Sequence, residues 1–315
     1  MSYTLVDKLV VATTSRALFD LDVEDGIFRA SGLETYRQYQ LEHESEVLRP
    51  GTAFHLVKAL LKINEGAGQR LVEVVLLSQN DADSGSRIFN SIEQHRLDIT
   101  RAAFCDGRHP YKYLEPFSCN LFLSAERKHV VAALGEGCPA ALVYRPPDGA
   151  ELEYDEVRIA FDGDAVLFAG DADEVFREEG FEAFKKYEKD LEQTPLKPGP
   201  LKSFLEAVHR IQAAFPEEKC PIRTMLVTAR SAPAHKRPIT TLRAWKIRLD
   251  ESLFLGGLEK ARFLRVLRPH IFFDDDCGNL EPAASTTPVA EVPRESGRKG
   301  PGKAAMPPHQ QEETA

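Results

Sequence analysis

The chain has 315 residues, 43% of them hydrophobic and 28% charged, with a net charge of −9, which is typical of a globular protein of one large or two modest domains. No apolar run approaches the ~20 residues of a membrane span, the first residues do not resemble a secretion signal, and no basic patch favours polymeric nucleic acid as a partner. Five scattered cysteines without a Cys-x-x-Cys pair favour reduced thiols in the cytoplasm over disulfides or a zinc site.

Short apolar runs of strand length alternate along the chain with longer runs of helical spacing. The strand-like runs are Lys8–Ala12, Val72–Leu77, Ala140–Tyr144, Val157–Phe161, Thr224–Val227 and Ile271–Phe273. The helix-like runs are Phe54–Asn64, Val175–Glu192, Leu201–Phe215 and Ile239–Lys246. This alternation predicts an α/β fold with a mainly parallel sheet and helices on both faces.

The two halves of the chain share a pattern that indicates an internal repeat. Ala17–Asp22 resembles Ile159–Asp164, and Pro50-Gly51 resembles Pro198-Gly199. From Ser78 and Thr228 onward the halves align without a gap, at an offset of 228 − 78 = 150. Identity is low, and any two α/β units share an apolar rhythm, so a chance similarity is the alternative.

The alignment predicts different tasks for the two halves. Ser124-Ala125 and Pro110 in the first half stand where the second half has Asp274-Asp275 and Lys260. We therefore expect residues 1–150 to frame the site and recognise a nucleoside, and residues 151–278 to carry the chemistry, with a helical cap at about 170–200. Residues 279–315 are expected to be a disordered tail, because Glu281–Ala315 has almost no large apolar side chains.

The polar groups that follow the strand-like runs of the second half are those that a phosphate-transfer site needs. Asp162-Gly163-Asp164, Thr228 and Asp274–Asp276 each follow an apolar run, and Lys260 lies between the last two. Ligands of open α/β sheets collect at the carboxyl ends of strands, so these groups are expected to converge. Carboxylates suit Mg²⁺, and a hydroxyl and an ammonium group suit a phosphate.

Each of these patterns also has an ordinary structural interpretation. Asp162-Gly163-Asp164 is good turn chemistry, and Asp274–Asp276 is compatible with a solvated acidic loop. Thr228 could cap a helix, and most lysines, Lys260 included, could simply solvate a surface. It is the combination of all four, in this order and behind apolar strands, that favours a site.

The sequence resembles the haloacid-dehalogenase superfamily and, more closely, the cytosolic 5′-nucleotidase I family. The superfamily pattern is Asp-x-Asp after a strand, then Thr or Ser, then Lys, then paired acids. The closer resemblance rests on stretches that span nearly all of the expected folded part: Ser15–Leu21, Tyr39–Glu44, Ala160–Phe168, Gly199–Lys202, Cys220–Thr224, Leu226–Ala232 and Arg268–Asp275.

The resemblance implies a Mg²⁺-dependent phosphatase with a HAD-like Rossmannoid fold that acts on nucleoside 5′-monophosphates. Asp162 would be the nucleophile that forms an aspartyl-phosphate, and Asp164 the general acid and base. Thr228, the backbone N–H of Ala229, and Lys260 would hold the phosphoryl group.

The resemblance also implies a set of metal ligands. Asp162, the backbone carbonyl of Asp164, and Asp274 would bind Mg²⁺, with Asp275 supporting the site or acting as an alternative ligand. The charge of Mg²⁺ would keep Asp162 ionised at neutral pH.

Recognition of the base and sugar is assigned to polar groups near other expected strand ends, with loop or helix-surface polarity as the alternative. These candidates are Asn80, Arg87, Asn90, Lys202 and Arg230. Two other functions compete with the nucleotidase: a phosphatase for another small phosphomonoester, and a catalytically silent nucleotide-binding protein. The sequence does not specify the preferred base or the oligomeric state, and a homo-oligomer is possible.

Overall fold

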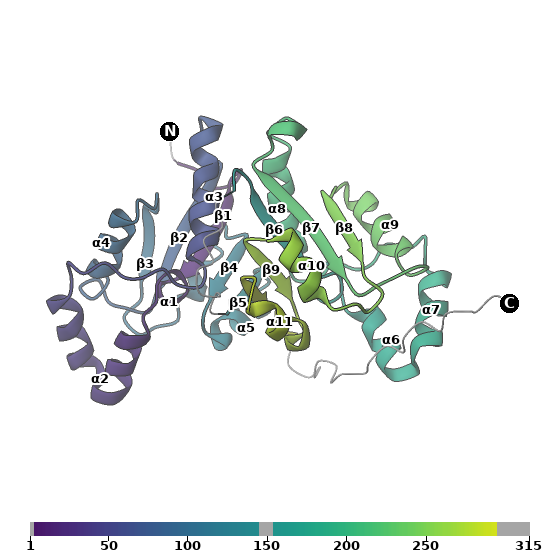
Figure 1. The fold of residues 1–315 in the computed structure, drawn as a ribbon. Coiled ribbons are helices and arrows are strands. Elements are labelled where there is room, and N and C mark those ends of the chain that lie inside the picture. The colour runs from purple at the N-terminus through teal and green to yellow at the C-terminus, as the bar shows by residue number, and fades with distance from the viewer. Residues whose placement is uncertain (1–2, 145–153, 295–315) are drawn as a thin grey trace.

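The structure is a computed structural model that describes residues 3–144 and 154–294, and Figure 1 shows two α/β halves joined through one sheet. The boundary expected at 150 and 151 lies outside the described residues. The elements of the first half are β1 (Leu9–Thr14), α1 (Ser15–Leu18), α2 (Asp22–Glu42), α3 (Phe54–Ala67), β2 (Val72–Ser78), α4 (Ser86–Gln94), β3 (Arg101–Phe104), the 3-10 turn η1 (Pro110–Tyr113), β4 (Leu121–Ser124), α5 (Arg127–Gly135) and β5 (Ala140–Val143).

The second half repeats this succession of elements. They are β6 (Val157–Phe161), α6 (Asp171–Glu179), α7 (Phe181–Asp190), α8 (Lys202–Gln212), the 3-10 turn η2 (Glu217–Lys219), β7 (Ile222–Thr228), α9 (Lys236–Trp245), β8 (Glu251–Phe254), α10 (Lys260–Leu267), β9 (Ile271–Asp274), α11 (Cys277–Ala284) and β10 (Val289–Glu291). Over both halves, the sequence patterns predicted six of the ten described strands: β1, β2, β5, β6, β7 and β9. They missed β3, β4, β8 and β10, which have only three or four residues each.

The described strands form one sheet in the order β3-β2-β1-β4-β5-β10-β9-β6-β7-β8. Neighbours within each half run parallel, and the halves meet through the antiparallel pair of β5 and β10. Numbered from its own start, each half therefore has the strand order 3-2-1-4-5. This shared order confirms the internal repeat at the level of architecture, together with the mainly parallel α/β sheet.

Helices cover both faces of the sheet because the side chains of its buried strands alternate between two apolar layers. On one face a continuous core includes Leu60 of α3, Phe204 of α8, and Ile159 of β6. Figure 1 shows α3 and α8 on the same side of the sheet, and each contacts a strand of the other half. On the opposite face the two halves have separate cores, one under α5 and one under α10 and α11. The shared core joins the halves into one packed unit.

The strand register corrects one part of the proposed repeat. Thr13 of β1 pairs with Leu123 of β4, and Phe161 of β6 pairs with Phe273 of β9. Because Leu123 and Phe273 are equivalent at the offset of 150, Thr13 is equivalent to Phe161, and the residue after it, Thr14, is equivalent to Asp162. The alignment of Ala17–Asp22 with Ile159–Asp164 was therefore wrong, since it followed a local apolar pattern and not the pairing of the strands.

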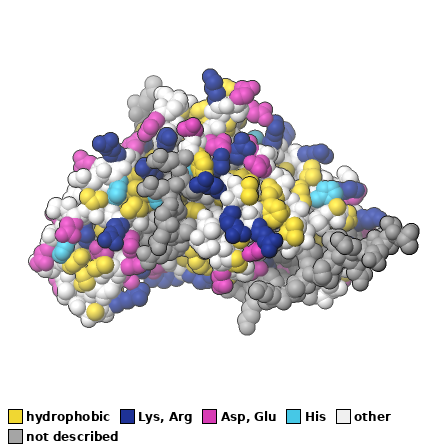
Figure 2. Space-filling view, viewed as in Figure 1, with side chains coloured by type: hydrophobic (Ala, Val, Ile, Leu, Met, Phe, Trp, Pro, Cys, Tyr) yellow, Lys and Arg dark blue, Asp and Glu magenta, His cyan; other side chains and the backbone are white. Residues whose placement is uncertain are grey.

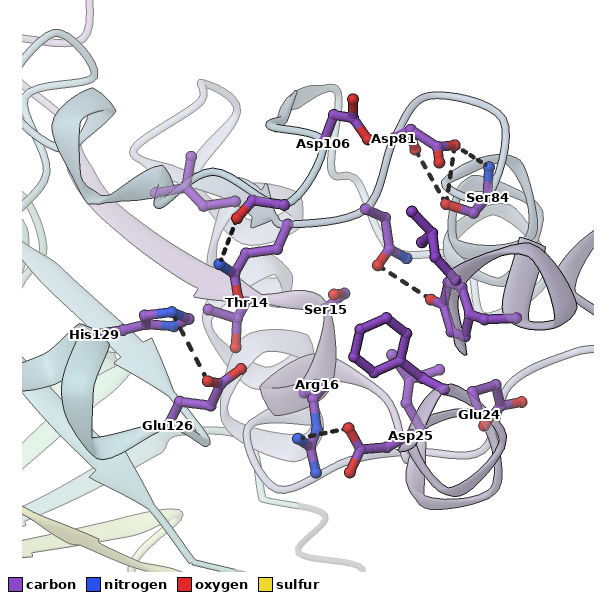
Figure 3. A pocket seen from close by; sticks show the side chains of 18 of the residues that line it. Thr14, Ser15, Arg16, Glu24, Asp25, Asp81, Ser84, Asp106, Glu126 and His129 are labelled. Carbon is purple, nitrogen blue, oxygen red and sulfur yellow. Dashed lines mark hydrogen bonds and ion pairs between the residues drawn. The ribbon is translucent and has the colours of Figure 1, made fainter. Parts of the chain in front are cut away.

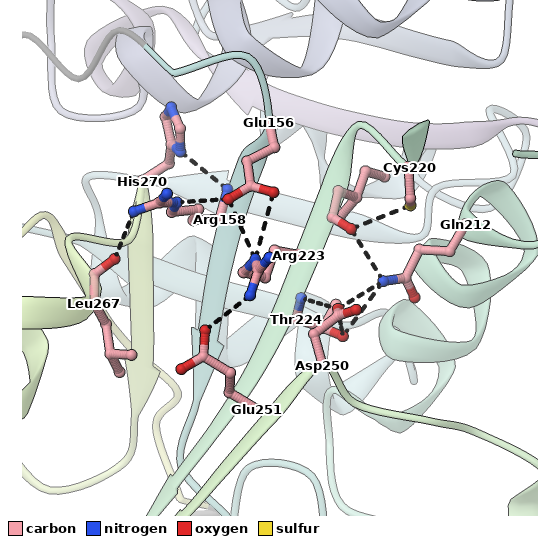
Figure 4. A network of polar contacts seen from close by, with 11 residues as sticks. Glu156, Arg158, Gln212, Cys220, Arg223, Thr224, Asp250, Glu251, Leu267 and His270 are labelled. Carbon is pink, nitrogen blue, oxygen red and sulfur yellow. Dashed lines mark hydrogen bonds and ion pairs between the residues drawn. The ribbon is translucent and has the colours of Figure 1, made fainter. Parts of the chain in front are cut away.

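The amino ends of the second-half strands are held by the polar network in Figure 4. Glu156 contacts Arg158 and Arg223, and Arg223 also donates to Glu251 of β8 at 3.1 Å. In the first half the equivalent pair has the charges exchanged, with Arg101 of β3 donating to Glu73 of β2 at 2.6 Å. These contacts tie strands together at the end of the sheet opposite to Asp162.

The expected cap between β6 and α8 consists of two helices. Gly180, with a φ of 84°, separates α6 from α7, so the single helix expected over Val175–Glu192 was wrong. The first half has a counterpart in α2, which is broken at Gly32 with a φ of 80°. Both glycines have a positive φ, which other residues rarely adopt. Helical spacing describes the pattern of apolar side chains and not the backbone angles, so it did not reveal the breaks.

The folded part continues beyond the boundary that we expected at residue 278. α11 covers Cys277–Ala284, and β10 lies inside the sheet between β5 and β9. The tail expected from 279 is therefore folded through Arg294, and residues 295–315 lie outside the described part. β10 has only three residues and gives little sequence signal, but its antiparallel pairing with β5 connects the two halves of the sheet.

Within the described residues, no helix combines the length and apolar character needed to cross a membrane. Figure 2 shows charged side chains of both signs interspersed with hydrophobic ones on the face toward the viewer. The most exposed large hydrophobic side chain is Val266 of α10, at 80%.

Gly199 offers a test of how tightly the loop after Asp164 is packed. A Cβ atom there would lie 2.6 Å from the carbonyl oxygen of Val166 and 2.7 Å from that of Phe168, and backbone atoms cannot easily move. We expect Gly199→Ala to lower the free energy of unfolding in urea by about 2 kcal/mol or more. Gly26→Ala is the control, because its Cβ would meet nothing within 4 Å and alanine favours the helix. Equal stabilities for the two variants would contradict this packing.

Candidate active site

The second half brings its polar side chains to the sheet edge where β6, β7 and β9 end. β6 and β9 are neighbours, and the chain continues from β6 to β7 on one side and from β9 to β10 on the other, so the carboxyl ends of β6 and β9 form a switch point of the sheet. Asp162 follows β6, Thr228 ends β7, and Asp274 ends β9. Asp162, Thr228 and Asp274 are buried, although all three are polar.

Lys260 connects the carboxylates of this edge. It is the first residue of α10, and its Nζ lies 2.7 Å from Asp162 Oδ1 and 2.7 Å from Asp274 Oδ2. One carboxylate oxygen each from Asp162, Asp274 and Asp275 lie within 4.8 Å of one another. This cluster is compact enough for a single cation to reach three carboxylates.

Neighbouring groups fix the orientation of the last two acids. Asp274 accepts hydrogen bonds from the backbone N–H of Asp276 at 2.8 Å and from Asn279 Nδ2 at 3.1 Å. Asp275 contacts Arg294. The side chain of Asp276 accepts from the N–H of Gly278 and so caps α11. Of the three consecutive acids, Asp274 and Asp275 therefore join the cluster, and Asp276 has a structural task.

The charges of the cluster perturb its titration. Burial raises the pKa of Asp162 well above its usual range, Lys260 opposes this, and the charges of Asp274 and Asp275 add to it. Burial alone would lower the pKa of Lys260, but the carboxylates of Asp162 and Asp274 outweigh it and hold that pKa above its usual range. The ammonium group therefore stays charged, and a cation bound beside Asp162 would favour the ionised form of its carboxyl group.

This arrangement suits a divalent cation. The three carboxylates face two cationic side chains, Lys260 and Arg294, so one negative charge remains in excess before any phosphate enters. Hard oxygen ligands of this kind are those that Mg²⁺ prefers. Asp162, Asp274 and Asp275 thus fit such a metal in their donor atoms, their spacing and their charge.

The carboxylate of Asp164 lies in a separate ion-pair network that reaches the cap. Arg230 binds it through two parallel hydrogen bonds, Nε to Oδ2 and Nη2 to Oδ1, both at 2.7 Å. Arg230 also donates to Glu188 of α7 at 2.5 Å, and Glu188 accepts from Arg237 of α9 at 3.0 Å. The side chain of Glu188 is fully buried. The cap helix is thereby linked through charged groups to the loop that carries Asp164.

The loop after β6 approaches the end of β7 closely at Gly163. A Cβ atom at Gly163 would lie 3.2 Å from Thr228 Oγ1, so the two strand ends converge there. Thr228 accepts from the backbone N–H of Arg230 at 3.2 Å, and Ala229 between them is exposed. A hydroxyl followed by a turn of backbone amides is a suitable phosphate cradle.

Comparison with known proteins identifies the family. A sequence profile of the 5′-nucleotidase family matches residues 1–299. The chain belongs to the 5′-nucleotidase family. Over 298 residues it is 39% identical to cytosolic 5′-nucleotidase 1B of Homo sapiens, and the alignment covers 90% of this chain and 48% of the relative. The chain thus spans about half the length of that relative. No solved structure gives a significant match.

The further residues expected to bind substrate are dispersed over the structure. Asn80 lines a cavity in the first half, Arg87 contacts Glu24 and Gln40, and Asn90 donates to a backbone carbonyl. Lys202 pairs with Glu206 of its own helix and lies over Trp245. Of the five candidates, only Arg230 contacts a residue of the expected catalytic set.

Several residues that shape the candidate site were not predicted from the sequence. They are Glu188, Arg237, Asn279 and Arg294. Arg237 had one usable signal, since it aligns with Arg87 in the repeat, and both arginines contact the cap-like helix of their own half. The others carry no local pattern, because their partners lie on distant elements.

Proposed function

We propose that this protein hydrolyses nucleoside 5′-monophosphates to a nucleoside and phosphate, with Mg²⁺ as the metal and an aspartyl-phosphate as the intermediate. The observation that carries the proposal is the buried cluster of Asp162, Asp274 and Asp275 around Lys260, at the switch point of a chain of the 5′-nucleotidase family. The similarity to a protein named cytosolic 5′-nucleotidase 1B supports both the substrate class and a location in the cytosol.

In the first half-reaction a carboxylate oxygen of Asp162 attacks the phosphorus atom of the substrate. The bond between phosphorus and the ribose O5′ breaks, and Asp164 gives its proton to that oxygen, which releases the nucleoside. Lys260, Thr228 and the backbone N–H of Ala229 hold the phosphoryl oxygens and stabilise the charge that spreads over them.

In the second half-reaction a water molecule attacks the phosphorus atom of the aspartyl-phosphate. Asp164 accepts a proton from that water, the bond between phosphorus and Asp162 breaks, and inorganic phosphate leaves. Mg²⁺, held by Asp162, Asp274 and Asp275 and by the backbone carbonyl of Asp164, would neutralise the carboxylates and the phosphate when bound.

Arg230 adds a requirement to this sequence of steps. Both oxygens of Asp164 accept hydrogen bonds from Arg230, so the carboxyl group must release at least one of them before it can donate a proton. A phosphate dianion entering beside the pair would compete for the guanidinium group. We therefore assign Arg230 to substrate binding: its guanidinium group would transfer a hydrogen bond from Asp164 to the phosphate when the substrate enters.

The direct test is metal-dependent release of phosphate. We expect the full chain to release inorganic phosphate from a panel of nucleoside 5′-monophosphates with Mg²⁺, to lose at least ~100-fold in rate with EDTA, and to recover when Mg²⁺ is restored. Release from a generic phosphomonoester but from no nucleotide would favour another phosphatase. Silence on every substrate, together with nucleotide binding, would leave a binding protein.

A further inference from the structure

A cavity of about 520 Å³ lies in the first half, at the carboxyl ends of β1 and β2 and against α2 (Figure 3). The switch point of the first half lies between β1 and β4, because the chain continues from β1 to β2 on one side and from β4 to β5 on the other. The strand register places Thr14, at the end of β1, at the position of Asp162 in the second half. The cavity thus corresponds to the candidate active site, and its size is typical of small-molecule sites.

The floor of this cavity carries hydroxyl groups and lacks the phosphate-transfer set. The first half has Thr14, Pro110 and Ser124 at the positions of Asp162, Lys260 and Asp274. The hydroxyl oxygens of Ser15 and Ser78 lie 3.1 Å apart. Without equivalents of Asp162, Asp274 and Lys260, this floor cannot form an aspartyl-phosphate, so the cavity can bind a ligand but cannot hydrolyse a phosphate ester by the route proposed for the second half.

The charges of the wall are already matched. Arg16 and Arg29 both contact Asp25, at 3.3 and 2.7 Å, and Lys128 contacts Glu126 at 2.9 Å. Every cationic side chain among the described lining residues therefore has a carboxylate partner. An anionic ligand would compete with these carboxylates for the cationic side chains, whereas an uncharged ligand would not.

Two polar atoms of the wall nevertheless lack a hydrogen bond within the described part of the chain. They are Asn80 Nδ2 and His129 Nε2, and both atoms are buried. Asn80 Oδ1 accepts from the hydroxyl group of Tyr36 at 3.1 Å, which fixes the amide, and His129 Nε2 lies 3.9 Å from Glu126 Oε2. Buried polar atoms without partners are costly, so each of the two favours a polar ligand in the cavity.

The α2 side of the cavity offers an aromatic surface. Phe28 and Tyr36 meet edge to face with ring centroids 6.0 Å apart, and Phe28 is 48% exposed although it lines the cavity. Leu33, 45% exposed, lies beside them on the same helix. A planar ring can cover such a surface, because aromatic faces and edges attract one another and exclude water.

We propose that this first-half cavity binds an uncharged nucleoside, without a metal and without turnover. The base would lie against Phe28 and accept a hydrogen bond from Asn80, and the sugar hydroxyls would exchange hydrogen bonds with Thr14 and Ser15. The proposal goes beyond the proposed function, which rests on the second half, although a nucleoside is also the product of that reaction.

The test is isothermal titration of the full chain with adenosine, guanosine, inosine, cytidine and uridine in EDTA. We expect saturable binding of at least one nucleoside, weakened about tenfold by Phe28→Ala and restored by Phe28→Trp. Phe89→Ala is the matched control, because Phe89 is 41% exposed, lies on α4 and does not line the cavity. Equal thermal midpoints of the variants would exclude loss of folding.

Three results would overturn the proposal: no saturable binding of any nucleoside, equal affinities for wild type and Phe28→Ala, or tighter metal-free binding of a nucleoside 5′-monophosphate through Phe28. Phosphate release with Mg²⁺ is measured on the same preparations. Nucleoside binding without phosphate release would contradict the proposed function but support this inference. Phosphate release without nucleoside binding at this cavity would support the proposed function but overturn this inference.

Discussion

Asp162→Asn should reduce phosphate release from a nucleoside 5′-monophosphate by ~10⁴-fold or more, because an amide cannot serve as the attacking carboxylate. The substitution preserves the size of a side chain that is buried against Lys260 at 2.7 Å, so the fold should persist. The measurement is initial phosphate release at saturating Mg²⁺, with the thermal midpoint as a check of folding.

The matched control for this result is Asp155→Asn. Asp155 is exposed and precedes the same strand, β6, at its opposite end. It should keep wild-type turnover. A rate for Asp162→Asn within tenfold of the wild type would place the nucleophile elsewhere. Acid quench of the wild type during turnover should also trap phosphate on the protein, and Asp162→Asn should trap none.

Glu188→Ala should lower the free energy of unfolding by about 3–5 kcal/mol, because it leaves two buried guanidinium groups short of their shared partner. Glu188 lies between Arg230 and Arg237, and its side chain has no exposure to solvent. The measurement is equilibrium unfolding in urea. Glu188→Gln keeps the shape and one acceptor oxygen, so it should lose less than the alanine variant.

Glu182→Ala controls for a general effect of removing acids from α7. Glu182 lies on the same helix, is 84% exposed, and pairs with Lys185 at 3.0 Å. Exposed pairs of this kind contribute about 0–1 kcal/mol, so the control should unfold close to the wild type. A loss below ~1 kcal/mol for Glu188→Ala would mean that Arg230 and Arg237 find other partners or water.

The candidate site was predictable because a buried parallel strand leaves a plain trace in sequence. Such strands are covered on both faces, so Ile271–Phe273 is a continuous apolar run and Val157–Phe161 is apolar except for Arg158. The polar residue that ends each run must lie at the carboxyl edge of the sheet, which is why Asp162 and Asp274 could be placed together. Lys260 was predicted from its position between the runs Thr224–Val227 and Ile271–Phe273, and not from any local pattern.

Other parts of the molecule could not be predicted, because no local pattern specifies them. β10 has three residues, and its place between β5 and β9 depends on partners far away in the chain. The break at Gly180 is invisible to a search for helical spacing. The charged hydrogen bond between Glu188 and Arg230 joins residues that are far apart in the sequence, so neither residue predicts the other.

By itself, the sequence determined the α/β class, the repeat beyond Ser78, and the order of acids, threonine and lysine, because these depend on apolar periodicity and on short stretches of chain. The tertiary structure decided which groups meet. In the tertiary structure Asp275 joins the carboxylate cluster, Asp276 caps a helix, and Asp164 pairs with Arg230. The tertiary structure also provided a cavity in the half that has no equivalents of Asp162 and Asp274, because the switch point of a sheet depends on strand order and not on any single residue.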